Sequence, residues 1–332
     1  MGVRVTSECD SLNTLTICDV NKTQLNAAIA FNDENYIAVW SDERFGSSWY
    51  YRVVAARITT AGVVLDTGIC LGNGGEQREF RPDIAYDGNR CLVVWYHDLT
   101  PYGVYGRFVN NSCQPEDSII TIAQTAYYSS INPRIAFDGT NYLVVFNDKP
   151  GNYYNIYGQI VSPEGNLIGS KILIATDGIN QRYPDVIWDN HFYVIVWGEG
   201  LSGIKGQRVD ADGHCINSSF QISNNTPYTR YQPSIAVSDT NYLVVWCENR
   251  DTQHDIYGNI DQTIGIKENE PKHVSQAYLG PTIFSGPLKL PKGKTCKVFD
   301  ITGRAVMPHH IKPGVYFIGI DGNITHKVVK IR

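Results

Sequence analysis

The stretch PRIAFDGTNYLVVF, residues 133–146, decides the fold of this chain, because four further stretches repeat its pattern. Each begins with small or apolar residues, passes through a polar turn and ends in an apolar run closed by an aromatic residue. The others read AAIAFNDENYIAVW (27–40), PDIAYDGNRCLVVW (82–95), PDVIWDNHFYVIVW (184–197) and PSIAVSDTNYLVVW (233–246). The closing aromatics are Trp40, Trp95, Phe146, Trp197 and Trp246, at intervals of about 50 residues. This regularity indicates five structural repeats.

Each repeat divides into four short strands. In the third repeat, residues 135–137 and 142–146 form two apolar runs joined by Asp138-Gly139, a dipeptide that favours a tight hairpin turn. A third run carries Tyr157-Gly158, and a fourth follows the polar turn at 162–166. Four antiparallel strands every 50 or so residues are typical of a β-propeller blade. The sequence therefore predicts an all-β fold: a five-bladed β-propeller over residues 1–268, with the closing aromatics buried at equivalent positions.

The N-terminal stretch matches only the later half of a repeat. Residues 3–18 resemble the third and fourth strands around 208–222 and contain no first or second strand of their own. We expect these residues to add outer strands to the blade that begins at Pro233. This would join the two ends of the propeller and remove an open sheet edge.

The C-terminal residues 284–332 follow a different pattern, after a linker at 269–283. Three segments alternate apolar and polar residues: KVFDITGR (297–304), IKPGVYFI (311–318) and KVVKIR (327–332). Turn residues separate them, which predicts a small antiparallel β-sandwich. In composition and order the segments resemble the C-terminal sorting domain of the type IX secretion system (the Por secretion family), although the Asn-Pro-Phe opening of that family is missing. The resemblance implies export, and hence a secreted or cell-surface bacterial protein.

Composition excludes several classes of function. The net charge is -5 and only 18% of residues are charged, whereas a nucleic-acid-binding protein needs a basic face. The apolar runs are strand-sized, so no membrane span is predicted. No CxxC pair or zinc-spaced histidine occurs, and nucleotide-binding and metalloprotease motifs are absent, so neither cofactor nor metal is predicted.

The eight cysteines lie far apart in the sequence. An even number at long spacing is typical of disulfides in an oxidising compartment, and buried free thiols are the alternative. We expect at least two disulfides, one of them involving Cys9 or Cys18. The candidates are Cys9, Cys18, Cys70, Cys91, Cys113, Cys215, Cys247 and Cys296.

Two sets of loop residues are candidates for function. Acids stand two residues after most closing aromatics: Asp42, Asp148, Glu199 and Glu248, with His97-Asp98 in the second repeat. A ring of carboxylates could hydrolyse a glycoside, but because the acids recur in nearly every blade we favour hydrogen bonding within the loops. The second set could stack on sugars or connect neighbouring blades, and comprises Arg44, Arg81, Tyr128, Arg182, Tyr183, Arg230 and Tyr231.

Three functions remain open. Because no locally unique catalytic constellation is visible, the sequence favours a non-enzymatic structural, self-assembling or adhesive protein without catalytic residues. Its partner would be a second copy of itself, joined through the C-terminal sandwich. The first alternative is a lectin-like propeller that binds glycans, and the second is a glycoside hydrolase, which rests on analogy of fold.

Overall fold

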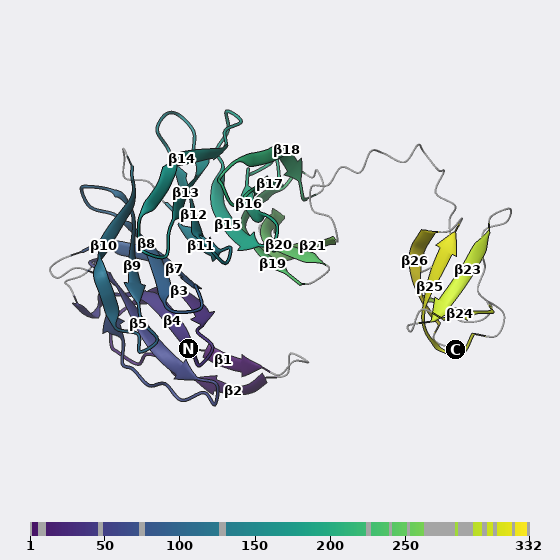
Figure 1. Ribbon diagram of the computed structural model, residues 1–332, viewed down its shortest axis with the longest axis horizontal. Coiled ribbons are helices and arrows are strands. Elements are labelled where there is room, and N and C mark those ends of the chain that lie inside the picture. The colour runs from purple at the N-terminus through teal and green to yellow at the C-terminus, as the bar shows by residue number, and fades with distance from the viewer. Residues whose placement is uncertain are drawn as a thin grey trace. The chain divides into compact units, whose positions relative to one another are not determined.

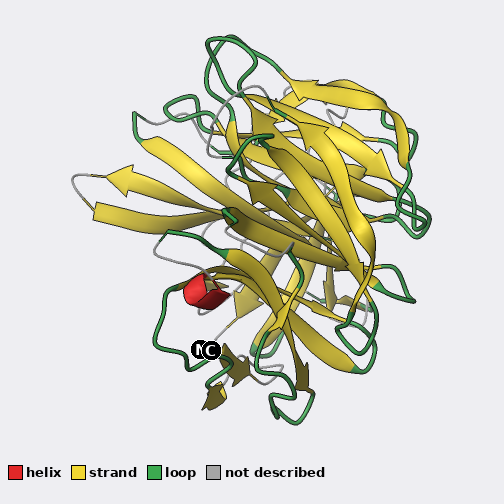
Figure 2. Cartoon of the chain, turned by 90° about the vertical axis from the view of Figure 1, so that its left-hand side faces the viewer, coloured by secondary structure: helices red, strands yellow, loops and turns green. Residues whose placement is uncertain are grey.

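The structure is a computed structural model of the chain. It describes residues 2–5, 11–45, 49–72, 77–125, 131–223, 227–238, 241–250, 253–261, 283–284, 295–300, 304–307, 311–320 and 323–330. The chain divides into two compact units, Met1–Ile266 and Lys267–Arg332. Among the described residues, the single helical element is the 3-10 turn η1 (Glu43–Phe45), and the remaining elements are strands (Figure 2). No helical segment in this part of the chain has the length and hydropathy of a membrane span.

Five antiparallel sheets make up the first unit, each built from strands that are consecutive in the sequence. Blade 1 contains β3 (Gln24–Phe31), β4 (Asn35–Asp42), β5 (Arg52–Thr59) and β6 (Ile69–Cys70). Blade 2 contains β7 (Glu79–Tyr86), β8 (Cys91–His97), β9 (Gly103–Val109) and β10 (Pro115–Gln124). Blade 3 contains β11 (Arg134–Phe137), β12 (Tyr142–Asp148), β13 (Asn155–Val161) and β14 (Leu167–Ala175). Blade 4 contains β15 (Arg182–Trp188), β16 (Tyr193–Gly198), β17 (Ile204–Val209) and β18 (Cys215–Gln221), and blade 5 contains β19 (Thr229–Val237), β20 (Tyr242–Arg250) and β21 (Gln253–Asp261).

The five sheets follow one another from purple to green, and the first strand of each lies innermost (Figure 1). Successive innermost strands are in contact: β3 with β7, β7 with β11, β11 with β15, and β15 with β19. The predicted five-bladed β-propeller is confirmed. The Asp-Gly turn of the third repeat is also as expected, because Gly139 has a φ of 96°, which glycine adopts without steric cost.

Apolar side chains fill the space between neighbouring blades. The closing aromatics Trp40, Trp95, Phe146, Trp197 and Trp246 are all buried, with at most 7% of their surface exposed. Phe146 belongs to the cluster between blades 2 and 3, Trp197 to that between blades 3 and 4, and Trp246 to that between blades 4 and 5. The recurring aromatic of the sequence is thus the recurring core residue of the fold.

A β-bulge interrupts the innermost strand of four blades. The pairing register shifts between Leu25 and Ala28, Phe80 and Asp83, Arg182 and Asp185, and Tyr231 and Ser234. Within these bulges lie residues with positive φ, namely Asn26 (55°), Arg81 (55°), Tyr183 (57°) and Gln232 (50°). Proline follows three of them, at a position where a bulge leaves the backbone N–H unpaired in any case. Bulges of this kind re-aim the side chains that follow them.

One face of blade 1 and one face of blade 5 are less covered than their counterparts elsewhere. Leu243 of blade 5 is 44% exposed, whereas the equivalent Leu143 of blade 3 is fully buried. Ile29 of blade 1 is 58% exposed, whereas the equivalent Val186 of blade 4 is 5% exposed. At the junctions between the other neighbouring blades, the faces equivalent to these two pack against each other.

The N-terminal strands form a hairpin, in which β1 (Gly2–Val5) pairs with β2 (Ser11–Leu15). Leu15, the last residue of β2, and Ile17 and Cys18 beyond it pack against the apolar face of blade 1 that includes Trp40. Among the described strands, blade 5 has three and β21 lies at its edge. Completion of blade 5 by the N-terminal strands therefore stays a prediction.

The described strands of the second unit form one five-stranded sheet in the order β22-β26-β25-β23-β24. They are β22 (Ile283–Phe284), β23 (Cys296–Asp300), β24 (Ala305–Val306), β25 (Gly314–Ile320) and β26 (Asn323–Lys330). A small core contains Val298, Ile311, Tyr316 and Ile318. The second sheet that a sandwich needs is not among the described residues, so the sandwich stays a prediction, and the linker at 269–283 lies almost wholly outside them.

The cysteines differ from the expectation drawn from the sequence. All seven described cysteines are free thiols, so none of the expected disulfides is formed among Cys18, Cys70, Cys91, Cys113, Cys215, Cys247 and Cys296; Cys9 lies outside the described residues. Cys91 and Cys113 are fully buried in the core between blades 1 and 2, and burial raises the pKa of each thiol to about 12. These two cysteines serve as small apolar core residues.

Candidate functional site

A cavity of about 510 Å³ lies where the innermost strands of all five blades converge. Its volume falls within the roughly 300–1,000 Å³ that is usual for small-molecule sites. Each blade contributes residues from the bulge of its innermost strand or, in blade 3, from the equivalent repeat position. The lining residues are Asn26, Ala27, Ala28, Arg81, Pro82, Asp83, Asn132, Arg134, Tyr183, Pro184, Asp185, Gln232, Pro233 and Ser234. The local irregularity of the innermost strands therefore builds the wall of the central cavity.

One repeat position in this wall differs from blade to blade. It is occupied, in blade order, by Ala28, Asp83, Arg134, Asp185 and Ser234. The fold places these five side chains around one cavity, although more than 200 residues separate the first from the last. Two carboxyl groups and one guanidinium thus line the cavity. The backbone of its wall repeats from blade to blade, whereas the charge of the side chain at this position does not.

The surroundings of Asp83 in the cavity wall shift its pKa. Burial raises the pKa of its carboxyl to about 6, Asp185 contributes in the same direction, and Arg134 opposes the shift. The backbone N–H of Ile135, in the next blade, donates a hydrogen bond of 3.0 Å to Asp83 Oδ2. A carboxyl with a pKa near 6 keeps its proton in slightly acidic solution and can donate it to a bound molecule.

Asp185 receives more hydrogen bonds than Asp83. The backbone N–H of Ile235 and the hydroxyl of Ser234 each donate to Asp185 Oδ2 at 2.9 Å. Arg134 Nε lies 3.7 Å from Asp185 Oδ1. Burial raises the pKa of Asp185 above its ordinary value, and these donors and Arg134 oppose that rise. Asp185 is therefore the better placed of the two to hold a negative charge.

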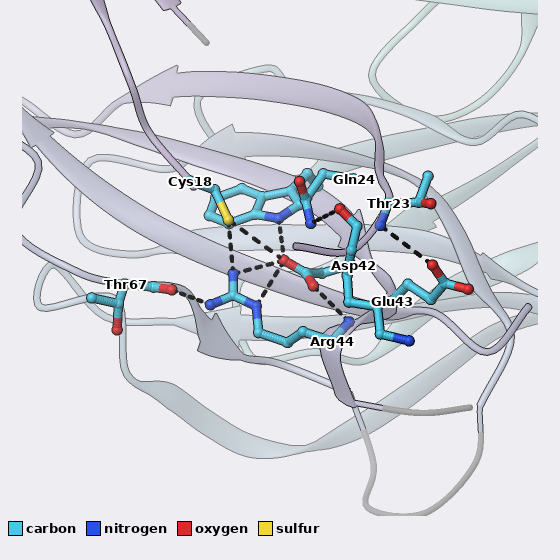
Figure 3. A network of polar contacts seen from close by, with 9 residues as sticks. Cys18, Thr23, Gln24, Asp42, Glu43, Arg44 and Thr67 are labelled. Atoms are coloured by element: carbon cyan, nitrogen blue, oxygen red, sulfur yellow. Dashed lines mark hydrogen bonds and ion pairs between the residues drawn. The ribbon is translucent and has the colours of Figure 1, made fainter. Parts of the chain in front are cut away.

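The acids that follow the closing aromatics have a structural role, as the repetition in the sequence suggested. Asp42 accepts hydrogen bonds from Trp40 Nε1 at 2.8 Å and from Arg44 Nε at 2.9 Å, and Cys18 lies beside the pair (Figure 3). Burial alone would raise the pKa of Asp42, but the hydrogen bonds from Arg44 and Trp40 hold it below its ordinary value. The buried Asp42 carboxylate fastens the loop of blade 1 to its core.

The same arrangement recurs in the later blades. Trp197 Nε1 donates to Glu199 at 2.9 Å, and Trp246 Nε1 donates to Glu248 at 3.3 Å. Arg230 Nε, almost fully buried, donates to Glu248 at 2.9 Å. In blade 2, Asp98 accepts from Tyr96 and pairs with Arg78, and in blade 3 Asp148 pairs with Lys171. None of these acids is among the residues that line the central cavity.

The seven residues of the proposed contact face are dispersed. Arg81 and Tyr183 line the central cavity, and Arg81 donates to Asn132. Arg44 and Arg230 are engaged by the buried acids, and Arg182 lies over the ring of Tyr154 at 3.9 Å. Tyr231 contacts His254, and Tyr128 lies outside the described residues. The structure therefore brings two of the seven into one site, and the role of all of them as ligand contacts stays a prediction.

One exposed cluster could suggest a metal ion. Asp210, Asp212 and His214 have ligand atoms within 4.8 Å of one another. Asp210 accepts hydrogen bonds from the backbone N–H groups of Asp212 and His214, which is the pattern of the hairpin turn between β17 and β18. Hydrogen bonding within the turn accounts for the cluster.

Comparison with known proteins supports the fold. No protein-family model matches the chain, and no characterised protein sequence matches it significantly. Among solved structures, an α-L-arabinofuranosidase from Fusarium graminearum in complex with an iminosugar inhibitor is 12% identical, with 69% of this chain and 72% of that chain covered and a TM-score of 0.50. A structure of the GH93 α-L-arabinofuranosidase of Fusarium graminearum with arabinobiose gives the same values. An α-L-arabinofuranosidase from Lactobacillus brevis is 12% identical over 88% of this chain and 97% of that chain, with a TM-score of 0.43.

These comparisons correct the function inferred from the sequence. The chain was expected to be a non-enzymatic structural, self-assembling or adhesive protein without catalytic residues. Two solved structures with the same fold are α-L-arabinofuranosidases, which contradicts that interpretation and favours the alternative of a glycoside hydrolase. At 12% identity the likeness itself establishes only the fold. The acids that recur from blade to blade lie outside the cavity, whereas Asp83 and Asp185 stand at a position where the repeats differ.

Proposed function

We propose that the propeller is a glycoside hydrolase whose active centre is the central cavity. The observation that carries this proposal is the pair Asp83 and Asp185, two carboxyl groups in one cavity with pKa values raised by burial. Hydrolysis of a glycosidic bond needs two such groups, because one must be protonated and the other ionised at the same pH.

Asp83 is assigned as the general acid. With a pKa of about 6 it retains its proton in mildly acidic solution and can transfer it to the oxygen of the departing sugar. Asp185 supplies the second carboxylate, which the donors from Ile235, Ser234 and Arg134 favour in its ionised form. Water provides the hydroxyl of the new sugar end, and the proton that Asp83 donates is replaced from the same water molecule, so the reaction balances as hydrolysis.

A structural role for the same two acids is the competing explanation. Each accepts a hydrogen bond from the backbone of the next blade, Asp83 from Ile135 and Asp185 from Ile235. Substitution by asparagine separates the two roles, because the amide oxygen can still accept that hydrogen bond while the side chain can no longer exchange a proton.

The experiment measures hydrolysis by the full chain and by its Asp83→Asn and Asp185→Asn variants. The substrates begin with 4-nitrophenyl arabinofuranoside, arabinan and arabinobiose, since arabinobiose is bound by the Fusarium enzyme, and extend to xylosides. We expect each variant to lose activity by about 10²-fold or more, and wild-type activity to fall as the pH rises through about 6. Asp177→Asn, which removes an acid paired with Lys205 at the surface, is the matched control.

Activity retained by both asparagine variants would assign the two acids a structural role. An inactive wild-type chain across the whole panel would reject the hydrolase.

We also propose that residues 284–332 act as a sorting domain for export to the cell surface or medium of a bacterium. Support comes from the three sequence motifs, which fall on β23, β25 and β26 and the segments that adjoin them. Fusion of residues 284–332 to a reporter, expressed in a bacterium with a type IX secretion system, should send the reporter outside the cell. A fusion that lacks 323–332 is the control, and export of both fusions or of neither would contradict the assignment.

A further inference from the structure

Trp49 is unlike the other five tryptophans of the chain. Four of those close a repeat and are buried, and Trp188 packs partly buried against the core between blades 3 and 4. Trp49 belongs to no repeat position and has 74% of its surface exposed. Its indole makes no hydrogen bond or ring contact with the residues that the structure describes. An indole held in water in this way is a flat apolar surface available to a ligand.

The backbone of Trp49 itself is fixed by a hydrogen bond to Glu43. Trp49 has a φ of 75°, a conformation that a bulky residue adopts only when its surroundings impose it. Its backbone N–H donates to Glu43 Oε1 at 3.1 Å. The other oxygen of that carboxylate accepts from the backbone N–H of Thr23 at 3.3 Å (Figure 3). In addition, Glu43 N donates to the Thr23 carbonyl at 3.0 Å. The hydrogen bonds from Trp49 and then Thr23 hold the pKa of Glu43 below its ordinary value.

Both ends of this loop are tied to segments that enter the central cavity. Thr23 is three residues before Asn26, which lines the cavity, and three residues of extended chain span at most about 10 Å. On the other side, Tyr51 exchanges backbone hydrogen bonds with Gln77 and Glu79, shortly before the cavity residue Arg81. Trp49 is thereby positioned beside the strands of blades 1 and 2 that form the cavity wall.

We propose that Trp49 is a sugar-stacking platform, a distal subsite for a glycan chain that extends from the central cavity. The inference rests on the proposed function and narrows it, since it makes the preferred substrate an oligosaccharide or polysaccharide rather than a single glycoside. The apolar face of a sugar ring lies on the indole, outside the cavity in which the bond is cleaved. Binding energy from such a remote unit holds the chain in the cavity and favours long substrates over short ones.

Binding is measured first, in a form that does not depend on activity. Trp49 is the exposed tryptophan, so its fluorescence should respond when a sugar covers it. The full chain carrying Asp83→Asn is titrated with arabinohexaose, arabinobiose and xylohexaose. We expect a hexasaccharide to quench or blue-shift the emission, and Trp49→Ala to remove the signal and weaken binding, followed by calorimetry, about 3- to 10-fold. Trp49→Tyr should restore most of the affinity.

Kinetic measurements then distinguish a role of Trp49 in binding long substrates from a role in the stability of the fold. With Asp83 intact, Trp49→Ala should lower kcat/KM on arabinan or xylan by the same factor and leave kcat/KM on the 4-nitrophenyl glycoside unchanged. Leu201→Ala, at another exposed position in a loop between second and third strands, is the matched control and should change neither.

Equal losses on long and short substrates, or unchanged hexasaccharide affinity in Trp49→Ala, would overturn the platform while leaving the hydrolase intact. If Trp49 binds the hexasaccharide but the chain hydrolyses none of the substrates, the platform would be supported and the assignment as a hydrolase would be rejected.

Discussion

Replacing Asp83 by asparagine should stabilise the propeller at neutral pH and leave it unchanged at pH 4. The carboxyl has an ordinary pKa of 3.8 and a pKa of about 6 in the folded protein. Since one pKa unit corresponds to 1.36 kcal/mol, ionised Asp83 lowers the free energy of unfolding by at most about 3 kcal/mol. The folded state binds the proton more tightly than the unfolded state. Stability is therefore lost as the pH rises from about 4 to about 6, and the loss is complete above that window.

The amide introduced by Asp83→Asn keeps an acceptor for the Ile135 N–H and carries no charge, so the variant avoids this loss. With an unfolding entropy of about 2.1 cal/mol/K per residue, 3 kcal/mol corresponds to roughly 5 °C in the Tm of a propeller of this size.

The assay is thermal unfolding of wild type, Asp83→Asn and the control Asp177→Asn, followed by circular dichroism between pH 3.5 and 8. The difference in Tm between Asp83→Asn and wild type should grow from near zero at pH 4 to a plateau above pH 6. The same difference measured for Asp177→Asn is the reference for removal of an acid at the surface. A constant difference, or a variant less stable than wild type at pH 7.5, would refute the raised pKa and with it the assignment of Asp83 as the acid.

Three further outcomes are expected. Trp197→Ala should lower the free energy of unfolding by about 3–5 kcal/mol in urea titrations, because the ring is fully buried between blades 3 and 4, and a loss below 1 kcal/mol would contradict its place in the core. If the exposed faces of blades 5 and 1 pack together, as the equivalent faces do at the other blade junctions, Leu243→Asp should lower the free energy of unfolding more than Leu167→Asp. The two residues are equally exposed, so Leu167→Asp is the control, and equal effects would mean that blades 5 and 1 do not pack together. In the native protein a thiol reagent should modify the exposed Cys215 and leave Cys91 and Cys113 untouched until unfolding, and rapid modification of either buried thiol would contradict its burial.

The fold could be predicted because its determinants are local and repeated. A run such as 142–146 alternates between two buried faces, ends in an aromatic and follows an Asp-Gly turn, and five copies at nearly constant spacing admit few architectures. The N-terminal strands were harder to place. Their sequence indicates strands three and four of a blade, but which sheet edge they pair with depends on contacts between the two ends of the propeller.

The site could be predicted only in part. The sequence indicates Arg81 and Tyr183 as candidate contact residues, and both line the cavity, but it does not indicate Asp83 and Asp185. Both acids are visible in the aligned repeats as the Pro-Asp pairs that open the second and fourth stretches. What the sequence does not show is that a bulge with a positive φ precedes them, so that this position faces the common centre of five blades. The signal that could have found them is the repeat position where residue type varies most in charge.

That variation is also an argument about role. If a carboxylate at this position were needed to hold neighbouring blades together, each junction would require one. The contact between β3 and β7 forms with Ala28 there, and the contact between β11 and β15 forms with Arg134. The fold therefore tolerates a methyl group and a cation where Asp83 and Asp185 stand. It nonetheless retains two partly buried carboxyls, with Arg134 near Asp185, at a cost that Asp83→Asn should reveal as added stability. A group that lowers stability, is not required by the architecture and lines a cavity is best explained by what it does to a bound molecule.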